Sequence, residues 1–165
     1  MLRLDATTDP RNDFTKIRNW RYGRILVRGG KMIEVQRRLT CGSVSMAQVW
    51  WQAKYGRSDD DVCWIDYHQP LGLPTFLTLD YIRAGTFAGY QSFSAACHIL
   101  DDIAHIRGAA AIVAHVSNGN ISDRLMTRMG WQRHLEDWKG RHWIRRFYDG
   151  YPPLSLDRYL AAKSA

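Results

Sequence analysis

The chain has 165 residues, of which 45% are hydrophobic and 24% charged, and its formal net charge is +7. This length suits one domain, and this apolar fraction excludes wholesale disorder. No apolar run approaches the roughly 20 residues that span a bilayer, and the first residues lack the apolar core of a secretory signal. We therefore expect a single domain over residues 1–165 that is soluble, cytoplasmic and not associated with membranes.

The cysteines and the basic residues are both scattered along the chain. Cys41, Cys63 and Cys97 match no zinc-binding spacing, which predicts reduced thiols and no bound metal. The basic excess forms no block of like charges. It is compatible with a nucleic acid, an anionic lipid surface, a phosphorylated ligand or an ordinary solvated surface.

In the N-terminal half, turn residues and apolar periods predict an arm, a hairpin and one helix. Residues 1–23 are polar and turn-rich, which predicts an N-terminal arm, anchored by Phe14, Ile17 and Trp20. The β-rich runs 24–27 and 32–39 flank a Gly-Gly pair, which is typical of a hairpin. A serine cap and helical spacing predict a helix over about 43–56.

In the middle of the chain, the pattern changes from strand to helix and back to strand. A strand is expected over 62–67, and the apolar run 75–82 predicts a central strand covered on both faces. A helix capped by Ser92 or Ser94 would run to Gly108, followed by a strand over 109–116. Such a strand–helix–strand unit predicts parallel neighbours or near neighbours with a right-handed crossover.

In the C-terminal part of the chain, predicted helices and strands alternate again. A short helix over 121–129, strands over 131–138 and 141–147, and a last helix over 156–162 are expected. Strands alternating with helices indicate an α/β (α+β) class with a mixed sheet and helices on its faces.

The most specific local pattern lies between Ala111 and Trp131. A strand that ends in Asn118 is followed by a short helix and by the pair Gly130-Trp131. This order resembles the GNAT (Gcn5-related N-acetyltransferase) family over about residues 60–148. The resemblance implies a mostly antiparallel twisted sheet flanked by helices on both faces. It also implies transfer of an acyl group from acetyl-CoA, or another acyl-CoA, to an amine.

In this family the pyrophosphate of the donor binds a glycine-rich turn between the central strand and its helix, where backbone amides and the helix dipole hold it. The equivalent stretch is 88–94, where the expected glycines are replaced by Gln91 and Phe93. The resemblance assigns donor binding to the edge of the central strand and to this turn, and thus to Tyr81, Ile82, Gly89, Tyr90, Gln91, Ser92, Phe93, Ser94 and Asn118.

Acyl transfer to an amine needs a base for the ammonium and an acid for the leaving thiolate. Asp80 lies near the end of the central strand, and His115 ends the next strand. Many family members carry the acid as a tyrosine on the short helix, where this chain offers only Ser122 near the helix start. We predict Asp80, His115 and Ser122 as catalytic, with Asp66 and Tyr67 facing the same cleft. The alternative is that Asp80 and His115 are structural.

Two further sequence patterns have alternative interpretations. The spacing of His98, Asp101, Asp102 and His105 places them on one helix face, either as metal ligands or, as we favour, as a solvated polar face. The basic and aromatic hairpin 131–148 is compatible with nucleic-acid binding or with a rim that attracts the phosphates of CoA. A catalytically inactive GNAT-fold binding module and a homodimer formed through this hairpin are further options.

Overall fold

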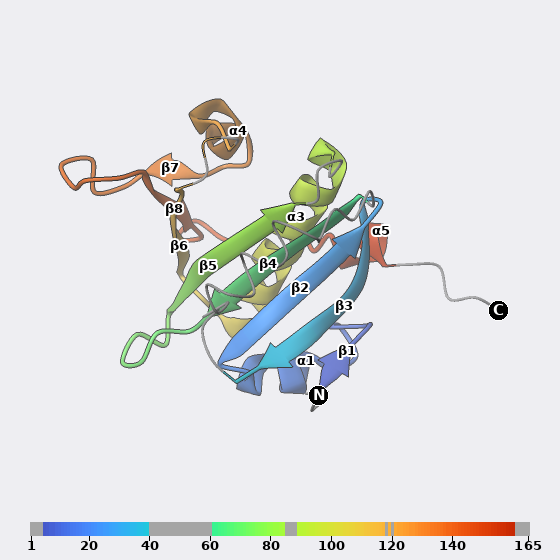
Figure 1. Ribbon diagram of the computed structural model, residues 1–165. Helices are drawn as coiled ribbons and strands as arrows, with labels where there is room; N and C mark the ends of the chain where they lie inside the picture. Colours follow the sequence, from blue (N-terminus) through green and yellow to red (C-terminus); the bar gives the residue numbers. More distant parts are fainter. Residues whose placement is uncertain (1–4, 40–60, 85–88, 118, 120, 161–165) are drawn as a thin grey trace.

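The computed structural model describes residues 5–39, 61–84, 89–117, 119 and 121–160. Eight strands form one sheet in the order β1-β3-β2-β4-β5-β6-β8-β7, and every pairing is antiparallel except β5 with β6 (Figure 1). The strands are β1 (Ala6–Thr7), β2 (Tyr22–Arg28), β3 (Lys31–Arg38), β4 (Val62–His68), β5 (Phe76–Ala84), β6 (Ala111–His115), β7 (Gln132–Arg133) and β8 (His142–Arg146). The helices within the described residues are α1 (Phe14–Asn19), α3 (Tyr90–Arg107), α4 (Asp123–Arg128) and α5 (Leu156–Tyr159). This architecture confirms the predicted mixed, mostly antiparallel sheet with helices.

Residues 5–39 combine a confirmed hairpin with the described part of the expected arm, which belongs to the fold. Gly29 and Gly30 have φ values of 55° and 72°, as a two-residue turn between β2 and β3 requires. The expected arm adds strand β1 to the edge of the sheet and forms helix α1, which buries Ile17 while Phe14 stays 51% exposed. Of the three predicted anchors, Ile17 and Trp20 are buried in the core and Phe14 is not.

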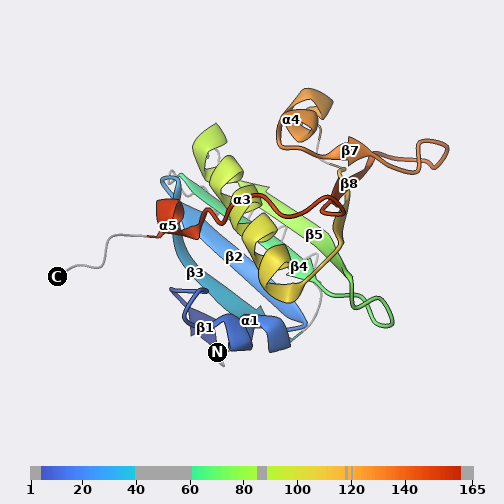
Figure 2. The ribbon, with the colours of Figure 1, turned by 180° about the vertical axis from the view of Figure 1, so that it is seen from behind.

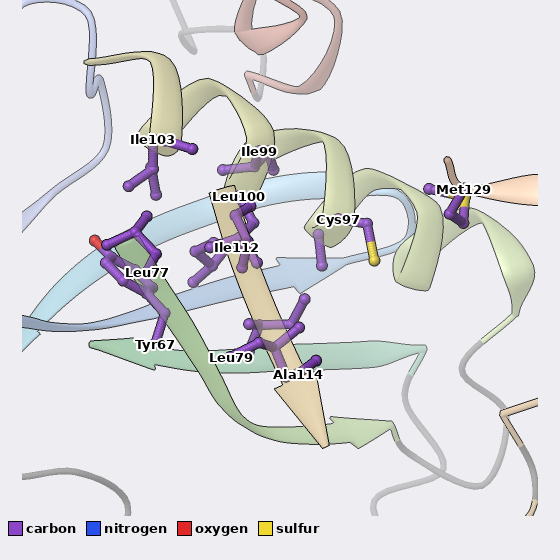
Figure 3. Packing of buried hydrophobic residues seen from close by; sticks show 14 of the residues in the cluster. Tyr67, Leu77, Leu79, Cys97, Ile99, Leu100, Ile103, Ile112, Ala114 and Met129 are labelled. Atoms are coloured by element: carbon purple, nitrogen blue, oxygen red, sulfur yellow. The ribbon is translucent and has the colours of Figure 1, made fainter. Parts of the chain in front are cut away.

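Helix α3 covers one face of the sheet, and α1 and α5 pack beside it (Figure 2). Leu77 and Leu79 of β5, together with Ile112 and Ala114 of β6, point toward this helix (Figure 3). On β5, Thr78 and Asp80 are half-buried, so within the described residues only the helix-facing side of this strand is fully covered. The helix expected over 43–56 lies outside the described residues.

The two cysteines that the structure describes are free and buried, as predicted. Burial raises the pKa of the Cys63 thiol to about 12. Cys97 packs in the core on α3, and burial also raises its pKa well above the ordinary value. Both thiols are therefore inert core groups. Cys41 lies outside the described residues.

The C-terminal part of the chain covers most of the polar face of α3. Asp101 and Asp102 are buried and His98 is half-buried, so the expectation of a solvated face is wrong for these three, whereas His105 is exposed. Asp102 accepts hydrogen bonds from the backbone and side chain of Ser155, and His105 stacks on Tyr151 at 4.3 Å. Nδ1 of His98 lies 2.5 Å from the hydroxyl of Tyr159, and Asp101 accepts a hydrogen bond from Arg145 at 3.2 Å. The four groups have different partners, and the described residues contain no group of three or more metal-ligating side chains.

The C-terminal elements are shorter than predicted. The strand expected over 131–138 is only β7, because the chain leaves the ladder at Leu135, where φ is 52°. Helix α5 ends at Tyr159, and Leu160 forms an isolated bridge with Met32 instead of continuing the helix.

None of the helices in the described part of the chain is both long and apolar enough to cross a membrane.

A close contact between β2 and β4 yields a first prediction. Gly23 pairs with Tyr67, and a Cβ at Gly23 would overlap the phenol ring. Tyr67 is 1% exposed, so its ring has to shift against packed neighbours, and Gly23→Ala is expected to lower the free energy of unfolding by about 1–3 kcal/mol in urea titrations. The control is Gly119→Ala, whose Cβ would meet nothing within 4 Å. Equal stabilities of the two variants would contradict the prediction.

Candidate active site

The parallel ladder between the neighbouring strands β5 and β6 covers only the first part of β5. Their parallel ladder runs from the pair Phe76–Ala111 to the pair Leu79–Ala114 and ends there, although β5 continues to Ala84. Strand β6 pairs on its other side with β8, so the sheet opens on one edge of β5 (Figure 1). The two strands diverge toward their carboxyl ends, where ligands of open sheets containing parallel strands are bound.

A β-bulge lies at the point where the strands separate. In the pairing of β4 with β5, Tyr67 lies opposite Leu79 and Asp66 lies opposite Tyr81, which leaves Asp80 as the extra residue. A bulge of this kind bends the strand and re-aims a side chain. Here it directs Asp80 to His68, on the sheet face opposite α3.

The side chains of His68 and Asp80 form a close pair. Nδ1 of His68 lies 2.7 Å from both carboxylate oxygens of Asp80, and each side chain is 16% exposed. The imidazole ring also stacks on Tyr22 of β2, at 5.7 Å between ring centroids. Burial raises the pKa of Asp80, while His68 acts in the opposite direction and the nearby Asp66 adds to the rise.

A second ion pair lies on the same sheet face. The guanidinium of Arg24 donates to both carboxylate oxygens of Asp66 at 2.6 and 2.8 Å, and it lies 5.3 Å from the ring centroid of Trp64. Strands β2, β4 and β5 thereby assemble one group of polar side chains. We call it the polar-face cluster, and its members are Tyr22, Arg24, Asp66, His68 and Asp80.

The structure brings together some of the predicted catalytic residues and separates others. Asp66 and Asp80 share the polar-face cluster, whereas Tyr67 points to the opposite, helix-covered face and is buried. His115 lies at the end of β6, is exposed and stacks on His142 at 4.7 Å. Ser122 is the N-cap of α4 and accepts a hydrogen bond from the Leu125 amide at 3.2 Å.

Helix α3 begins at Tyr90, before the expected caps Ser92 and Ser94, so most of the predicted donor-binding turn is helical. Gly89 is the N-cap, and its N–H donates to the Asp61 carboxylate at 3.1 Å. Ser92 is fully buried and accepts from the Gly30 amide, and Phe93 is 7% exposed in the core. Neither Ser92 nor Ser94 caps the helix, because both lie within it.

The remaining predicted donor-binding residues flank this turn. Tyr90 and Gln91 are exposed at the start of α3, and the Arg128 guanidinium lies 5.4 Å from the centroid of the Tyr90 ring. Tyr81 and Ile82 are half-buried on β5 beyond the bulge. Asn118 lies outside the described residues.

The basic residues of the C-terminal hairpin make extensive contacts within the protein. Arg141 binds Asp123 at 2.9 Å, Arg145 binds Asp101 at 3.2 Å, and Arg146 contacts Gln132. Most of the aromatic rings between 131 and 148 are buried; the exposed ones are Trp138 and Tyr148. These arginines and the buried rings are thus engaged within the fold, whereas Trp138 and Tyr148 stay exposed.

Three members of the polar-face cluster were not predicted as site residues. Tyr22 falls in the expected arm, Arg24 begins the first predicted strand, and His68 is one residue beyond the predicted end of the strand at 62–67. The available signal was alternation, since Trp64, Asp66 and His68 recur every second residue and must share a face.

Comparison with known proteins yields little beyond this geometry. No family model matches the chain, and no curated protein sequence matches it. Among solved structures, the crystal structure of Tetrahymena GCN5 aligns at 10% identity with a TM-score of 0.39. That alignment covers 57% of this chain and 61% of the GCN5 chain, so the match spans less than two thirds of that protein's length.

Proposed function

We propose that this chain is a GNAT-like, acyl-CoA-dependent N-acyltransferase whose reaction takes place where β5 and β6 separate. The observation that carries the proposal is that three features of the sheet lie at the same place. The parallel ladder ends at Leu79, the bulge lies at Asp80, and the His68–Asp80 pair lies beside the opening. An opened sheet next to a bulge and a pair of titratable groups favours a site of chemistry over a purely structural irregularity.

The donor would lie along the free edge of β5. No ladder pair joins β5 to β6 beyond Leu79 within the described strands, so the peptide groups from Asp80 to Ile82 are able to bind the amides of an extended pantetheine chain. This is the interaction by which a peptide or amide chain extends a sheet.

The phosphates of the donor would meet the start of α3. The amides of Tyr90, Gln91 and Ser92 belong to the first turn, where the helix dipole favours anions, and Arg128 adds a positive charge beside Tyr90. The carboxylate of Asp61 already occupies the Gly89 amide and opposes an anion there. The side chains of Ser92 and Phe93 are excluded from this proposal because they are buried.

The acceptor would be a cationic amine that approaches the polar-face cluster. Two carboxylates face one guanidinium in this cluster, and this excess of acidic groups favours the approach of an ammonium group. We expect the acyl group to pass to such an amine.

A second candidate is an acyl-CoA-binding module without catalysis. Helix α4 carries no tyrosine, and its N-cap Ser122 is engaged with the Leu125 amide. No group on this helix is thus an evident acid for the thiolate. Binding of the donor would be shared by both candidates, whereas turnover would distinguish them.

Thermal unfolding with added ligand tests donor binding. Acetyl-CoA or CoA at about 100 times its dissociation constant should add about 2.7 kcal/mol of stability, which raises Tm by roughly 5–10 °C in a chain of this size. Pantetheine alone and generic DNA serve as control ligands. The proposal fails if neither acetyl-CoA nor CoA shifts Tm, and salt-sensitive binding of DNA would instead favour a nucleic-acid partner.

A further inference from the structure

We propose that His68 is the general base of this site and that Asp80 is the residue that positions it. This assignment rests on the proposed acyl transfer and changes the role that the sequence suggested for Asp80. It identifies the side chain that takes the proton from the acceptor amine.

The hydrogen bond to Asp80 determines which nitrogen of His68 is basic. A carboxylate accepts hydrogen bonds, so Nδ1 of His68, at 2.7 Å from both of its oxygens, carries the proton that is shared with Asp80. In neutral imidazole the lone pair is then on Nε2. Within the described residues Nε2 of His68 makes no hydrogen bond, and it is thus available to a substrate.

The two side chains are suited to different parts of the task. Imidazole is the side chain that most often serves as a general base in enzymes. The Asp80 carboxylate is half-buried and engaged with His68, where it orients the ring and stabilises the imidazolium that forms. This division of roles makes Asp80 a positioning residue.

The surroundings of His68 come from three strands. Asp80 faces it from β5, Tyr22 stacks on it from β2, and Asp66 precedes it by two residues on the same face of β4. Asp66 is neutralised by Arg24, so the carboxylate with the strongest influence on His68 is Asp80. Stacking on Tyr22 restricts rotation of the ring and keeps Nε2 in one direction.

The chemical step follows from this arrangement. The Nε2 atom of His68 removes one proton from the acceptor ammonium, directly or through one water molecule. The free amine attacks the thioester carbonyl, a C–N bond forms and the C–S bond breaks. The second proton of the amine passes to the departing thiolate, so the products are an amide, the CoA thiol and a proton on His68 that returns to solvent.

The test compares His68→Gln, Asp80→Asn and a matched control, His105→Gln, which changes a histidine on the other side of the sheet. Release of the CoA thiol from acetyl-CoA is followed between pH 5 and 9 with a panel of small primary amines and with water as acceptors. Donor binding is measured in parallel from the Tm shift with CoA. We expect His68→Gln to lose roughly 100- to 10,000-fold in kcat with an unchanged Tm shift.

Asp80→Asn is expected to move the acid limb of the pH profile to lower pH, because the imidazolium loses its carboxylate partner. A structural role alone would not move this limb. The assignment is overturned if His68→Gln turns over like the His105→Gln control, which leaves acyl transfer itself intact. If CoA shifts the Tm of the native protein but no acceptor reacts, the site is non-catalytic and the assignment falls. Without a Tm shift, the proposed function fails first.

Discussion

Replacement of Arg24 by alanine is expected to lower the free energy of unfolding by about 3–5 kcal/mol, one of the largest effects of any single change in this protein. The Asp66 side chain is 3% exposed, and its carboxylate receives two hydrogen bonds from the guanidinium at 2.6 and 2.8 Å. Without Arg24 that charge stays buried with no countercharge. Urea unfolding monitored by tryptophan fluorescence measures the loss.

Two further variants separate the buried pair from an ordinary surface charge. Lys16 is 46% exposed and lies 3.6 Å from Asp13, so Lys16→Ala should cost only about 0–1 kcal/mol. Joint replacement of Arg24 by methionine and Asp66 by leucine removes both charges and should recover most of the stability lost in Arg24→Ala. A cost for Arg24→Ala no larger than that for Lys16→Ala would show that Asp66 does not depend on its partner.

The elements that could be predicted from the sequence are those determined by neighbouring residues. The Gly29-Gly30 turn needs positive φ at both positions, so the pair of glycines alone was enough to predict it. The left-handed Gly108, with φ of 68°, ends α3 for a similarly local reason. The parallel pairing of β5 with β6 followed from the crossover helix between them.

The His68–Asp80 pair was not predictable because it depends on a one-residue change of register. If the pairing beyond Leu79 had continued without a bulge, Asp80 would lie directly opposite Asp66, as two adjacent like charges. The bulge instead places Tyr81 opposite Asp66 and directs Asp80 to His68. No local sequence pattern predicts such a shift of register, because the shift results from the pairing of β4 with β5 across the loop that joins them.

The partners of the charged residues also required the fold. The sequence suggested that the basic hairpin forms a rim of free positive charge. Arg145 in fact reaches the buried Asp101 on α3 and the backbone carbonyl of Gly130, and Arg141 reaches Asp123 beside the start of α4. These contacts tie the C-terminal strands to the helices, so part of the net charge of +7 is used in holding the structure together.

Asp101 is expected to make the protein less stable as pH rises from about 4 to 6. Its side chain is 8% exposed, and burial raises its pKa from the ordinary 3.8 to about 6, although Arg145 at 3.2 Å opposes the change. Between these two values the folded chain binds more protons than the unfolded chain, so the free energy of unfolding falls with pH. The stabilisation is complete below about pH 3.8 and is lost as pH passes about 6.

A difference in pKa of this size corresponds to about 3 kcal/mol. Asp101→Asn removes the titrating group, so the stability of the native protein relative to this variant should fall by about 2–3 kcal/mol between pH 4 and pH 7, as measured by urea unfolding at each pH. The pKa values of Asp80 and Asp102 are also raised by burial. Both groups remain in the variant, so the difference between the two proteins reports Asp101 together with its repulsion of Asp102. Parallel stability curves for the two proteins would mean that Arg145 compensates fully for burial and that Asp101 titrates in the folded protein as it does in the unfolded chain.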